Sequence, residues 1–243
     1  DSSVESRSNF LLNQEGWYRD KKVELSLGTK VVAIDAAGGT VATGTGETVP
    51  YGKLILANGS TPFVPFREAA GLKNVFSIRT LDDARAANDL SGRVKTAVVI
   101  GGGLLGLEAA HSLLGRGVKV TVIEGADRIL PRQLDAESSR ILQNIVTEAN
   151  VALVMGKAIE AIQGEGIATG VRLSSGEVIP ADMVIISIGV RPNVEIAKGC
   201  GVAVNRAVVV NERMETSVPG IYACGDVAEF NGRCISLWMP AMK

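Results

Sequence analysis

Runs of apolar residues separated by glycine-rich turns divide the chain into short buried strands and amphipathic helices. The most distinct run, residues 97–100, has the length and β-branched composition of a buried parallel strand, and it stops at Gly101. The residues that follow, through about Arg116, place apolar side chains at helical spacing. A second strand-like run, residues 119–123, ends in Glu124. The pattern therefore predicts a strand–turn–helix–strand unit around these glycines.

The turn after the first of these strands carries a glycine pattern that is typical of phosphate binding. Gly101, Gly103 and Gly106 fit G-x-G-x-x-G. The first glycine lets the strand turn tightly, the second lets a pyrophosphate approach the backbone, and the third lets the helix pack closely. The N–H groups at the helix start, around Leu104 and Leu105, would face the phosphates. Such a turn also occurs for structural reasons alone, so the surrounding sequence has to support the interpretation.

Glu124 supplies that support. It lies 23 residues after Gly101, close to the spacing of about 20 at which the fingerprint places an acid. A carboxylate there accepts hydrogen bonds from the adenosine ribose hydroxyls and repels a 2′-phosphate, which favours NADH over NADPH. A solvated loop acid is the alternative interpretation, and Arg128 weakens the preference for NADH because an arginine accommodates a phosphate. This stretch predicts a nicotinamide dinucleotide site.

A layout of short strands occurs twice, at an offset of 128–130 residues. Each copy is expected to hold three short strands and one buried apolar strand: residues 23–28, 29–35, 40–49 and 54–57 in the first copy, and 151–156, 157–163, 169–173 and 184–186 in the second. Gly189 and Pro192 lie 130 residues beyond Gly59 and Pro62. The repeat predicts two related units, each a dinucleotide-type fold with an inserted β-meander.

The repeat also predicts what the first unit lacks. The counterpart of the turn at Gly101 would fall about 27 residues before Asp1. We therefore expect the chain to be an interior segment of a longer protein. The predicted fold class is α/β, with two Rossmann-like units carrying meander insertions and the first unit incomplete.

Other segments have weaker patterns. A helix is expected over residues 10–19, and a second helix begins after Thr80, a suitable N-cap with Asp83 at the third position. A short helix over residues 194–198 and a strand over 208–210 follow Pro192. These segments are expected to connect and cover the two units.

Composition narrows the classes of function. With 25 basic and 26 acidic residues, nothing indicates a nucleic-acid or membrane partner, and no apolar run reaches the ~18 residues of a spanning helix. Three widely spaced cysteines, Cys200, Cys224 and Cys234, indicate a reducing, cytoplasmic compartment and are interpreted as small buried residues. The single histidine, His111, is interpreted as a packed residue, and no metal site is expected.

Four segments resemble the signatures of the FAD-dependent pyridine nucleotide-disulfide oxidoreductase superfamily, in their usual order. They are residues 51–62, 101–108, 181–193 and 216–226. Residues 131–135 and 226–232 together with Trp238 are more similar to the branch that contains NADH:rubredoxin reductases and the flavin portion of NAD(P)H nitrite reductase large subunits. The resemblance covers nearly the whole chain.

The resemblance implies an FAD-binding domain in two pieces, residues 1–92 and 213–243, with an NAD(P)-binding domain, residues 93–212, between them. It places Ala57, Asn58, Gly59, Arg79, Gly225 and Asp226 near FAD, with Asp226 on the ribityl chain. Asn58 departs from the usual threonine. Glu108, as a candidate catalytic residue, and Gly189 would lie near the nicotinamide.

The implied activity is hydride transfer from NADH to FAD, followed by electron delivery to a rubredoxin or to a sirohaem and Fe–S module. A homodimer of the full-length protein is compatible with the family. The alternatives are an NADH oxidase, peroxide reductase or coenzyme A disulfide reductase that uses a cysteine upstream of Asp1, and a non-catalytic NAD-binding fragment or redox sensor. The segment by itself is expected to be inactive and nearly colourless.

Overall fold

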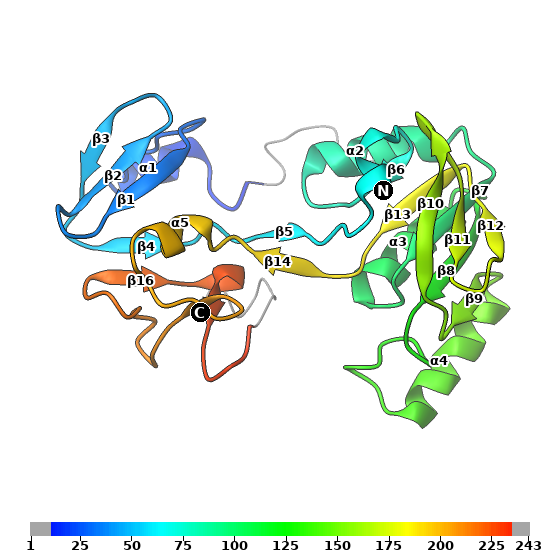
Figure 1. Ribbon diagram of the computed structural model, residues 1–243. Helices are drawn as coiled ribbons and strands as arrows, with labels where there is room; N and C mark the ends of the chain where they lie inside the picture. Colours follow the sequence, from blue (N-terminus) through cyan, green and yellow to red (C-terminus); the bar gives the residue numbers. More distant parts are fainter. Residues whose placement is uncertain (1–10, 235–243) are drawn as a thin grey trace. The chain divides into compact units, whose positions relative to one another are not determined.

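The computed structural model describes residues 11–234. The chain divides into two compact units (Figure 1). Unit 1 comprises Asp1–Asn58 and Asn193–Lys243, and unit 2 comprises Gly59–Pro192. Within the described residues, no helix has the length and apolar character needed to cross a membrane.

Unit 2 is built on a five-stranded parallel sheet with the strand order β6-β13-β7-β8-β9. The strands are β6 (Val75–Phe76), β7 (Thr96–Ile100), β8 (Lys119–Glu124), β9 (Ala152–Met155) and β13 (Met183–Ile186). Val98 and Val99 of β7 are fully buried, as a central strand covered on both faces requires. The parallel sheet confirms the predicted α/β class.

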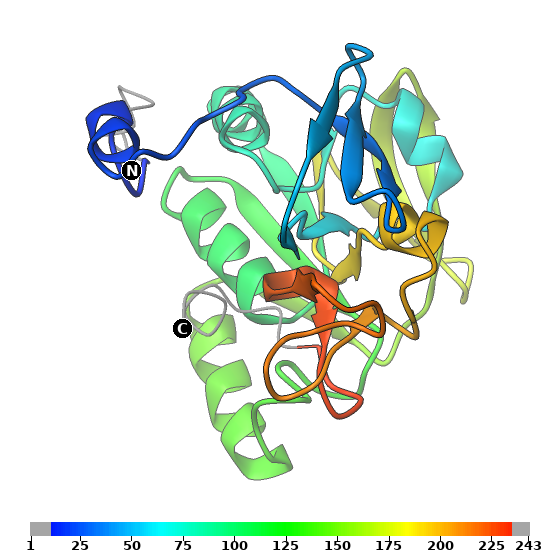
Figure 2. The ribbon, with the colours of Figure 1, turned by 90° about the vertical axis from the view of Figure 1, so that its left-hand side faces the viewer.

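One face of this sheet is covered by helices. They are α2 (Leu81–Ser91), α3 (Leu104–Leu114) and α4 (Ala136–Glu148). Val99 packs in one cluster with Ala87 of α2, Ala110 of α3 and Val146 of α4, and Figure 2 shows the three helices together on one side of the sheet.

The helix α2 begins as its sequence predicts. The Thr80 hydroxyl accepts a hydrogen bond from the Asp83 N–H (3.1 Å), and the Asp83 carboxylate accepts one from the Thr80 N–H (2.7 Å). The backbone hydrogen bond from Thr80 is the main cause that lowers the pKa of the Asp83 carboxyl. The predicted capping box is confirmed.

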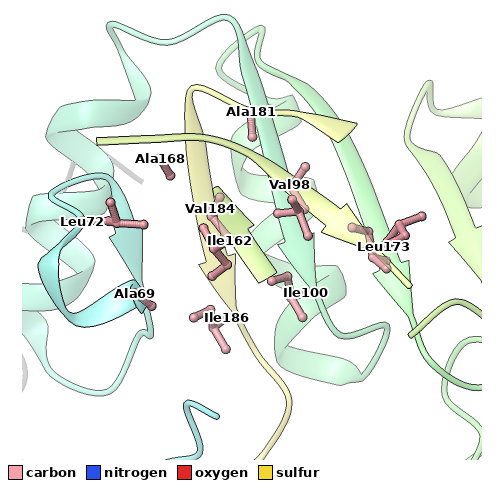
Figure 3. Close-up of a cluster of buried hydrophobic side chains, with 12 residues drawn as sticks. Ala69, Leu72, Val98, Ile100, Ile162, Ala168, Leu173, Ala181, Val184 and Ile186 are labelled. Carbon is pink, nitrogen blue, oxygen red and sulfur yellow. The ribbon is translucent and has the colours of Figure 1, made fainter. Parts of the chain in front are cut away.

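The other face of the sheet is covered by an antiparallel meander. Its strands are β10 (Ile159–Glu165), β11 (Ile167–Leu173) and β12 (Val178–Pro180), and the short helix η2 (Arg67–Gly71) lies beside it. Val98 and Ile100 of β7 face this side and pack against Ile162 and Leu173 (Figure 3). A separate antiparallel pair, β5 (Ser60–Pro62) and β14 (Val190–Pro192), completes unit 2.

Asn74 holds the meander to the parallel sheet. Its side chain, 4% exposed, donates hydrogen bonds to the carbonyl oxygens of Ala168 (2.9 Å) and Asp182 (2.7 Å). Its Oδ1 accepts one from the Ala168 N–H (2.6 Å). One amide therefore satisfies backbone groups at the start of β11 and just before β13.

Replacing Asn74 by alanine is expected to destabilise unit 2 by about 2–3 kcal/mol, because buried backbone groups lose their partners. Hydrogen exchange at the amides of β11 and β13 would measure the loss. Asn144→Ala, at an exposed position of α4, serves as the control and should change little. Unchanged protection in Asn74→Ala would show that this amide does not hold the meander.

Unit 1 contains a smaller version of the same layout. Its elements are α1 (Glu15–Asp20), β1 (Val31–Asp35), β2 (Thr40–Thr43), β3 (Thr48–Pro50), β4 (Leu54–Leu56), α5 (Glu195–Gly199), β15 (Val208–Val209), β16 (Ile221–Ala223), η3 (Gly225–Val227) and β17 (Ala228–Glu229). The strands β1, β2 and β3 form an antiparallel meander, β4 is parallel to β16, and β15 is parallel to β17. Leu56 and Ile221 share a buried cluster with Ile34 and Val41 of the meander.

The predicted repeat is present in the structure. The strands β1, β3 and β5 of the first copy recur as β10, β12 and β14 at offsets of 128–130 residues, and β4 corresponds to β13. Unit 2 begins at Gly59, whereas the sequence predicted that the second domain begins at residue 93. The difference arises because β6 pairs with β13 and α2 packs on the sheet of unit 2. The assignment of residues 1–92 and 213–243 to FAD and of 93–212 to NAD(P) stays a prediction.

Two strand predictions were wrong. Residues 23–28 form no strand: Val23, Leu25 and Leu27 are 45%, 41% and 75% exposed. Among residues 11–234, no strand pairs with this segment, so its alternating apolar side chains do not become one face of a sheet. Residues 40–49 form the two strands β2 and β3, because Gly46, with φ of +88°, reverses the chain between them.

Three smaller predictions also needed correction. The helix expected over residues 10–19 is shorter and begins at Glu15, and Phe10 lies outside the described residues. Cys200, Cys224 and Cys234 are half-buried and form no disulfide. His111 is exposed on α3, so its interpretation as a packed residue was wrong.

Candidate functional site

The glycine turn lies where the order of the parallel sheet reverses. From β7 the chain proceeds outward to β8 and β9, and it then returns to the other side of β7 as β13. Gly101 has φ of +113°, and a Cβ at this position would collide with the carbonyl oxygen of Ser187, which follows β13. Open parallel sheets bind ligands at the carboxyl ends of their strands, at such a switch point.

The other two glycines of the motif have different surroundings. A Cβ on Gly106 would collide with the carbonyl oxygen of Gly101, so this glycine lets α3 pack directly on the turn. A Cβ on Gly103 would meet nothing within 4 Å. Gly103 is the N-cap of α3 and supplies no side-chain acceptor, so the first N–H groups of the helix face a space open to a ligand. Leu104 and Leu105, the first two residues of α3, are 49% and 67% exposed.

Glu124 lies under this turn at the end of β8. Its carboxylate accepts hydrogen bonds from the N–H groups of Gly102 (2.7 Å) and Ala126 (2.9 Å). A Cβ on Gly102 would lie 3.0 Å from Ile129 Cγ2 and 3.1 Å from Glu124 Cβ, so any larger residue here would crowd these two side chains. Because each carboxylate oxygen has a second lone pair, Glu124 keeps acceptor capacity for a bound hydroxyl. The sequence motif gave no signal for this support of the turn.

A cavity of about 410 Å³ opens beside the turn, at the carboxyl ends of β7, β8 and β9. Its lining includes Gly101, Glu124, Lys157, Glu160 and Ile188. Ile188 lies within the signature over residues 181–193 but was not named as a site residue. Lys157 and Glu160 belong to no motif and are brought here by the strand order.

Two predicted residues lie at the same carboxyl edge without lining the cavity. Gly189, with φ of +103°, follows β13, and its carbonyl oxygen accepts a hydrogen bond from the Phe63 N–H (2.9 Å). Arg79 follows β6, and its Nη2 lies 3.2 Å from the position a Cβ would take on Gly59. Glu108 is exposed on α3, and the structure does not bring it to the cavity lining.

The residues predicted to lie near FAD in unit 1 meet at the carboxyl edge of a parallel strand pair. Ala57 and Asn58 follow β4, while Gly225 and Asp226 follow the neighbouring β16. The Cys224 N–H donates to the Leu56 carbonyl (3.0 Å), which carries the pairing to the end of both strands. The structure therefore brings these four residues to one edge, and Asp226 is half-buried there.

A pair of asparagines fixes the turn at Asn58. The Asn58 amide donates to the Asn193 carbonyl oxygen (2.7 Å), and the Asn193 amide donates to the Asn58 carbonyl oxygen (2.8 Å). This reciprocal contact joins the chain where it leaves unit 1 to the chain where it returns. Sequence reasoning placed Asn58 near FAD and noted its departure from threonine, but it missed the partner Asn193.

Within residues 11–234, no group of three or more histidine, cysteine, aspartate or glutamate side chains could hold a metal ion. The groups that the described site offers to a ligand are backbone N–H groups, small residues and a few charged side chains. This set suits a phosphate-containing ligand.

Comparisons with known proteins agree with this geometry. The chain is 39% identical over 232 residues to the NAD(P)H nitrite reductase of Bacillus subtilis (strain 168), covering 96% of this chain and 29% of the relative. It is 34% identical over 228 residues to the rubredoxin–NAD(+) reductase of Pseudomonas putida, covering 93% of this chain and 59% of the relative. A crystal structure of a ferredoxin reductase from Rhodopseudomonas palustris superposes with a TM-score of 0.89 at 32% identity, covering 94% of this chain and 57% of that one.

These relatives are longer than the chain, which spans between 29% and 59% of their lengths. The branch signature that includes Trp238 extends beyond the described residues. A family model described as pyridine nucleotide-disulphide oxidoreductase matches residues 3–243. By this match, and with its glycine turn at the switch point of a parallel sheet, the chain belongs to the pyridine nucleotide-disulphide oxidoreductase family.

Proposed function

We propose that the protein is a flavoprotein reductase that transfers a hydride from NADH to FAD and delivers the electrons to a redox partner. Two observations carry this proposal: a Cβ on Gly103 of the glycine turn would meet nothing within 4 Å, and a cavity lined by Gly101 and Glu124 opens beside the same turn. The proposal rests also on membership of the family, whose relatives include NAD(P)H- and NAD-dependent reductases.

The residues of unit 2 fit a nicotinamide dinucleotide. Backbone N–H groups at the start of α3 would bind the pyrophosphate, since Gly103 adds no side chain between them and a ligand. Glu124 would accept hydrogen bonds from the adenosine ribose while it holds Gly102 in place. Gly189 would let the nicotinamide approach the backbone after β13.

The residues at the edge of β4 and β16 fit part of a flavin site. Asp226 would accept a hydrogen bond from the ribityl chain, and the turn at Ala57 and Asn58 would pass close to the flavin. Arg79 and Gly59 lie together at a second edge, in unit 2. When bound, the nicotinamide supplies a hydride and the flavin accepts it and passes the electrons on. The side chains of this protein bind and orient the two groups.

The electron acceptor is proposed from the relatives. Their names include rubredoxin, ferredoxin and nitrite reductases. We infer that a small iron–sulfur protein, or a sirohaem and Fe–S domain, receives the electrons. Anaerobic mixing of the flavin-bound protein with NADH tests the first step. Bleaching of the flavin absorbance is expected, and a flavin that NADH leaves oxidised would contradict the proposal.

Replacing Asp226 by alanine is expected to weaken FAD binding about tenfold or more, because hydrogen bonds to a charged group contribute about 1.5–3 kcal/mol. Flavin released during dialysis, measured by its fluorescence, reports the loss. Glu24→Ala removes an exposed acid of the same unit and should release no additional flavin. Full flavin retention in Asp226→Ala would remove this residue from the proposed site.

A further inference from the structure

Three charged side chains line the cavity beside the glycine turn: Glu124, Lys157 and Glu160. Glu160 is paired with a cation, since its Oε2 lies 3.2 Å from Nε of Arg172. Glu124 is bonded to the neutral N–H groups of Gly102 and Ala126, so its negative charge is not compensated there. Lys157 is exposed and makes no ion pair within residues 11–234.

The fold places Lys157 next to Glu124. The strands β8 and β9 are parallel neighbours, and Glu124 pairs with Met155 in their register. The next residue, Gly156, has φ of +64° and donates its N–H to the Ala126 carbonyl oxygen (2.8 Å). The backbone of Lys157 is therefore held at the carboxyl edge of the sheet, two residues after Met155, the β-sheet partner of Glu124.

A second cation, Arg128, follows Glu124 by four residues in the sequence and forms an ion pair with its neighbour Asp127. Arg128 Nη1 lies 3.1 Å from Oδ1 of Asp127. Arg128 is not among the residues that line the cavity, whereas Lys157 is. Of the two cations, only Lys157 shares a wall with Glu124 and lacks an acidic partner in the described part of the chain.

We propose that Lys157 is a specificity-determining residue that lets this site accept NADPH in addition to NADH. The inference rests on the proposed function, which puts the adenosine ribose at Glu124. A 2′-phosphate on that ribose is repelled by the Glu124 carboxylate and attracted by the Lys157 ammonium. NADH lacks this phosphate, so Lys157 acts on the ratio of the two affinities rather than on nucleotide binding in general.

Calorimetric titration of the purified protein with NADH and with NADPH tests the inference. In Lys157→Met, which keeps much of the side-chain length without the charge, the NADPH dissociation constant is expected to rise about fivefold. The NADH constant should stay within about twofold. Lys119→Met removes an exposed lysine at the opposite end of β8 and should leave both constants unchanged. The difference in NADPH affinity between the wild type and Lys157→Met should shrink as salt is added, because exposed charges are screened.

Each contrary result has a separate meaning. An equal loss of both nucleotides in Lys157→Met would show that the ammonium contacts a group they share, and it would overturn the inference. A changed ratio in Arg128→Met but not in Lys157→Met would also overturn it. If the wild-type protein binds neither nucleotide, the proposed function itself fails.

Discussion

Replacing Gly103 by alanine is expected to weaken NADH binding about 100-fold, equivalent to about 2.7 kcal/mol, with little effect on folding. The added methyl group would enter the space that we assign to the pyrophosphate, because a Cβ there meets no protein atom within 4 Å. A phosphate pushed away from the start of α3 loses hydrogen bonds from the backbone N–H groups. Titration with NADH measures the loss, and the thermal unfolding midpoint reports the fold.

The neighbouring glycines provide the matched contrast. Alanine at Gly101 or Gly106 would collide with a backbone carbonyl oxygen, of Ser187 or Gly101 respectively. These two variants should lower the thermal unfolding midpoint, whereas Gly103→Ala should not. The carbonyl oxygens that the new methyl groups would meet belong to the backbone and cannot move without shifting a strand or a helix. If Gly103→Ala binds NADH like the wild type, the pyrophosphate does not lie at this turn.

The sequence predicted the parts of the structure that depend on local chemistry. The strand β7, the glycine turn and the capping box at Thr80 and Asp83 each follow from residue types at short spacing, and all three are present. The internal repeat also allowed predictions over a long range, because a strand recognised in one copy predicts a strand at the corresponding position in the other copy. That support failed at residues 23–28, which correspond to β9 but have no neighbouring strand to pair with in the described chain.

What the sequence could not predict depends on contacts between distant segments. The reciprocal pair of Asn58 and Asn193 spans 135 positions, and Asn74 reaches Ala168 across 94. Lys157 enters the cavity only because β9 lies beside β8. No pattern of residue types marks such contacts, since each needs the sheet order before its partner is defined.

Glu229 illustrates a buried charge whose role the structure alone defines. It is 3% exposed, and its carboxylate accepts hydrogen bonds from the Asn205 amide (2.8 Å) and from the N–H groups of Arg206 (2.9 Å) and Ala207 (3.0 Å). It ends β17, three residues after Asp226, so it anchors the segment that carries the proposed flavin ligand. Glu229→Ala is expected to destabilise unit 1 by about 2–3 kcal/mol, because one buried and two part-buried donors lose their charged acceptor.

The fluorescence of tryptophan and tyrosine does not report on unit 2, because the sequence of Gly59–Pro192 contains neither residue, whereas Trp17, Tyr51 and Tyr222 lie in unit 1. Urea unfolding followed by this signal measures the change. Glu212→Ala, at an exposed acid of the same unit, should shift the midpoint little. An equal effect of the two substitutions would show that the three hydrogen bonds contribute nothing to stability.

The same carboxylate makes a prediction for pH. The hydrogen bond from the Ala207 N–H, followed by those from Asn205 and Arg206, lowers the pKa of Glu229 in the folded protein. A group with a lowered folded pKa contributes its stability in full above its unfolded value of about 4.3, and that contribution is lost as pH falls through the folded pKa. Unit 1 should therefore lose stability below about pH 4 more steeply in the wild type than in Glu229→Gln, whose amide does not titrate. Parallel pH profiles of the two proteins would mean that another carboxylate controls the acid transition.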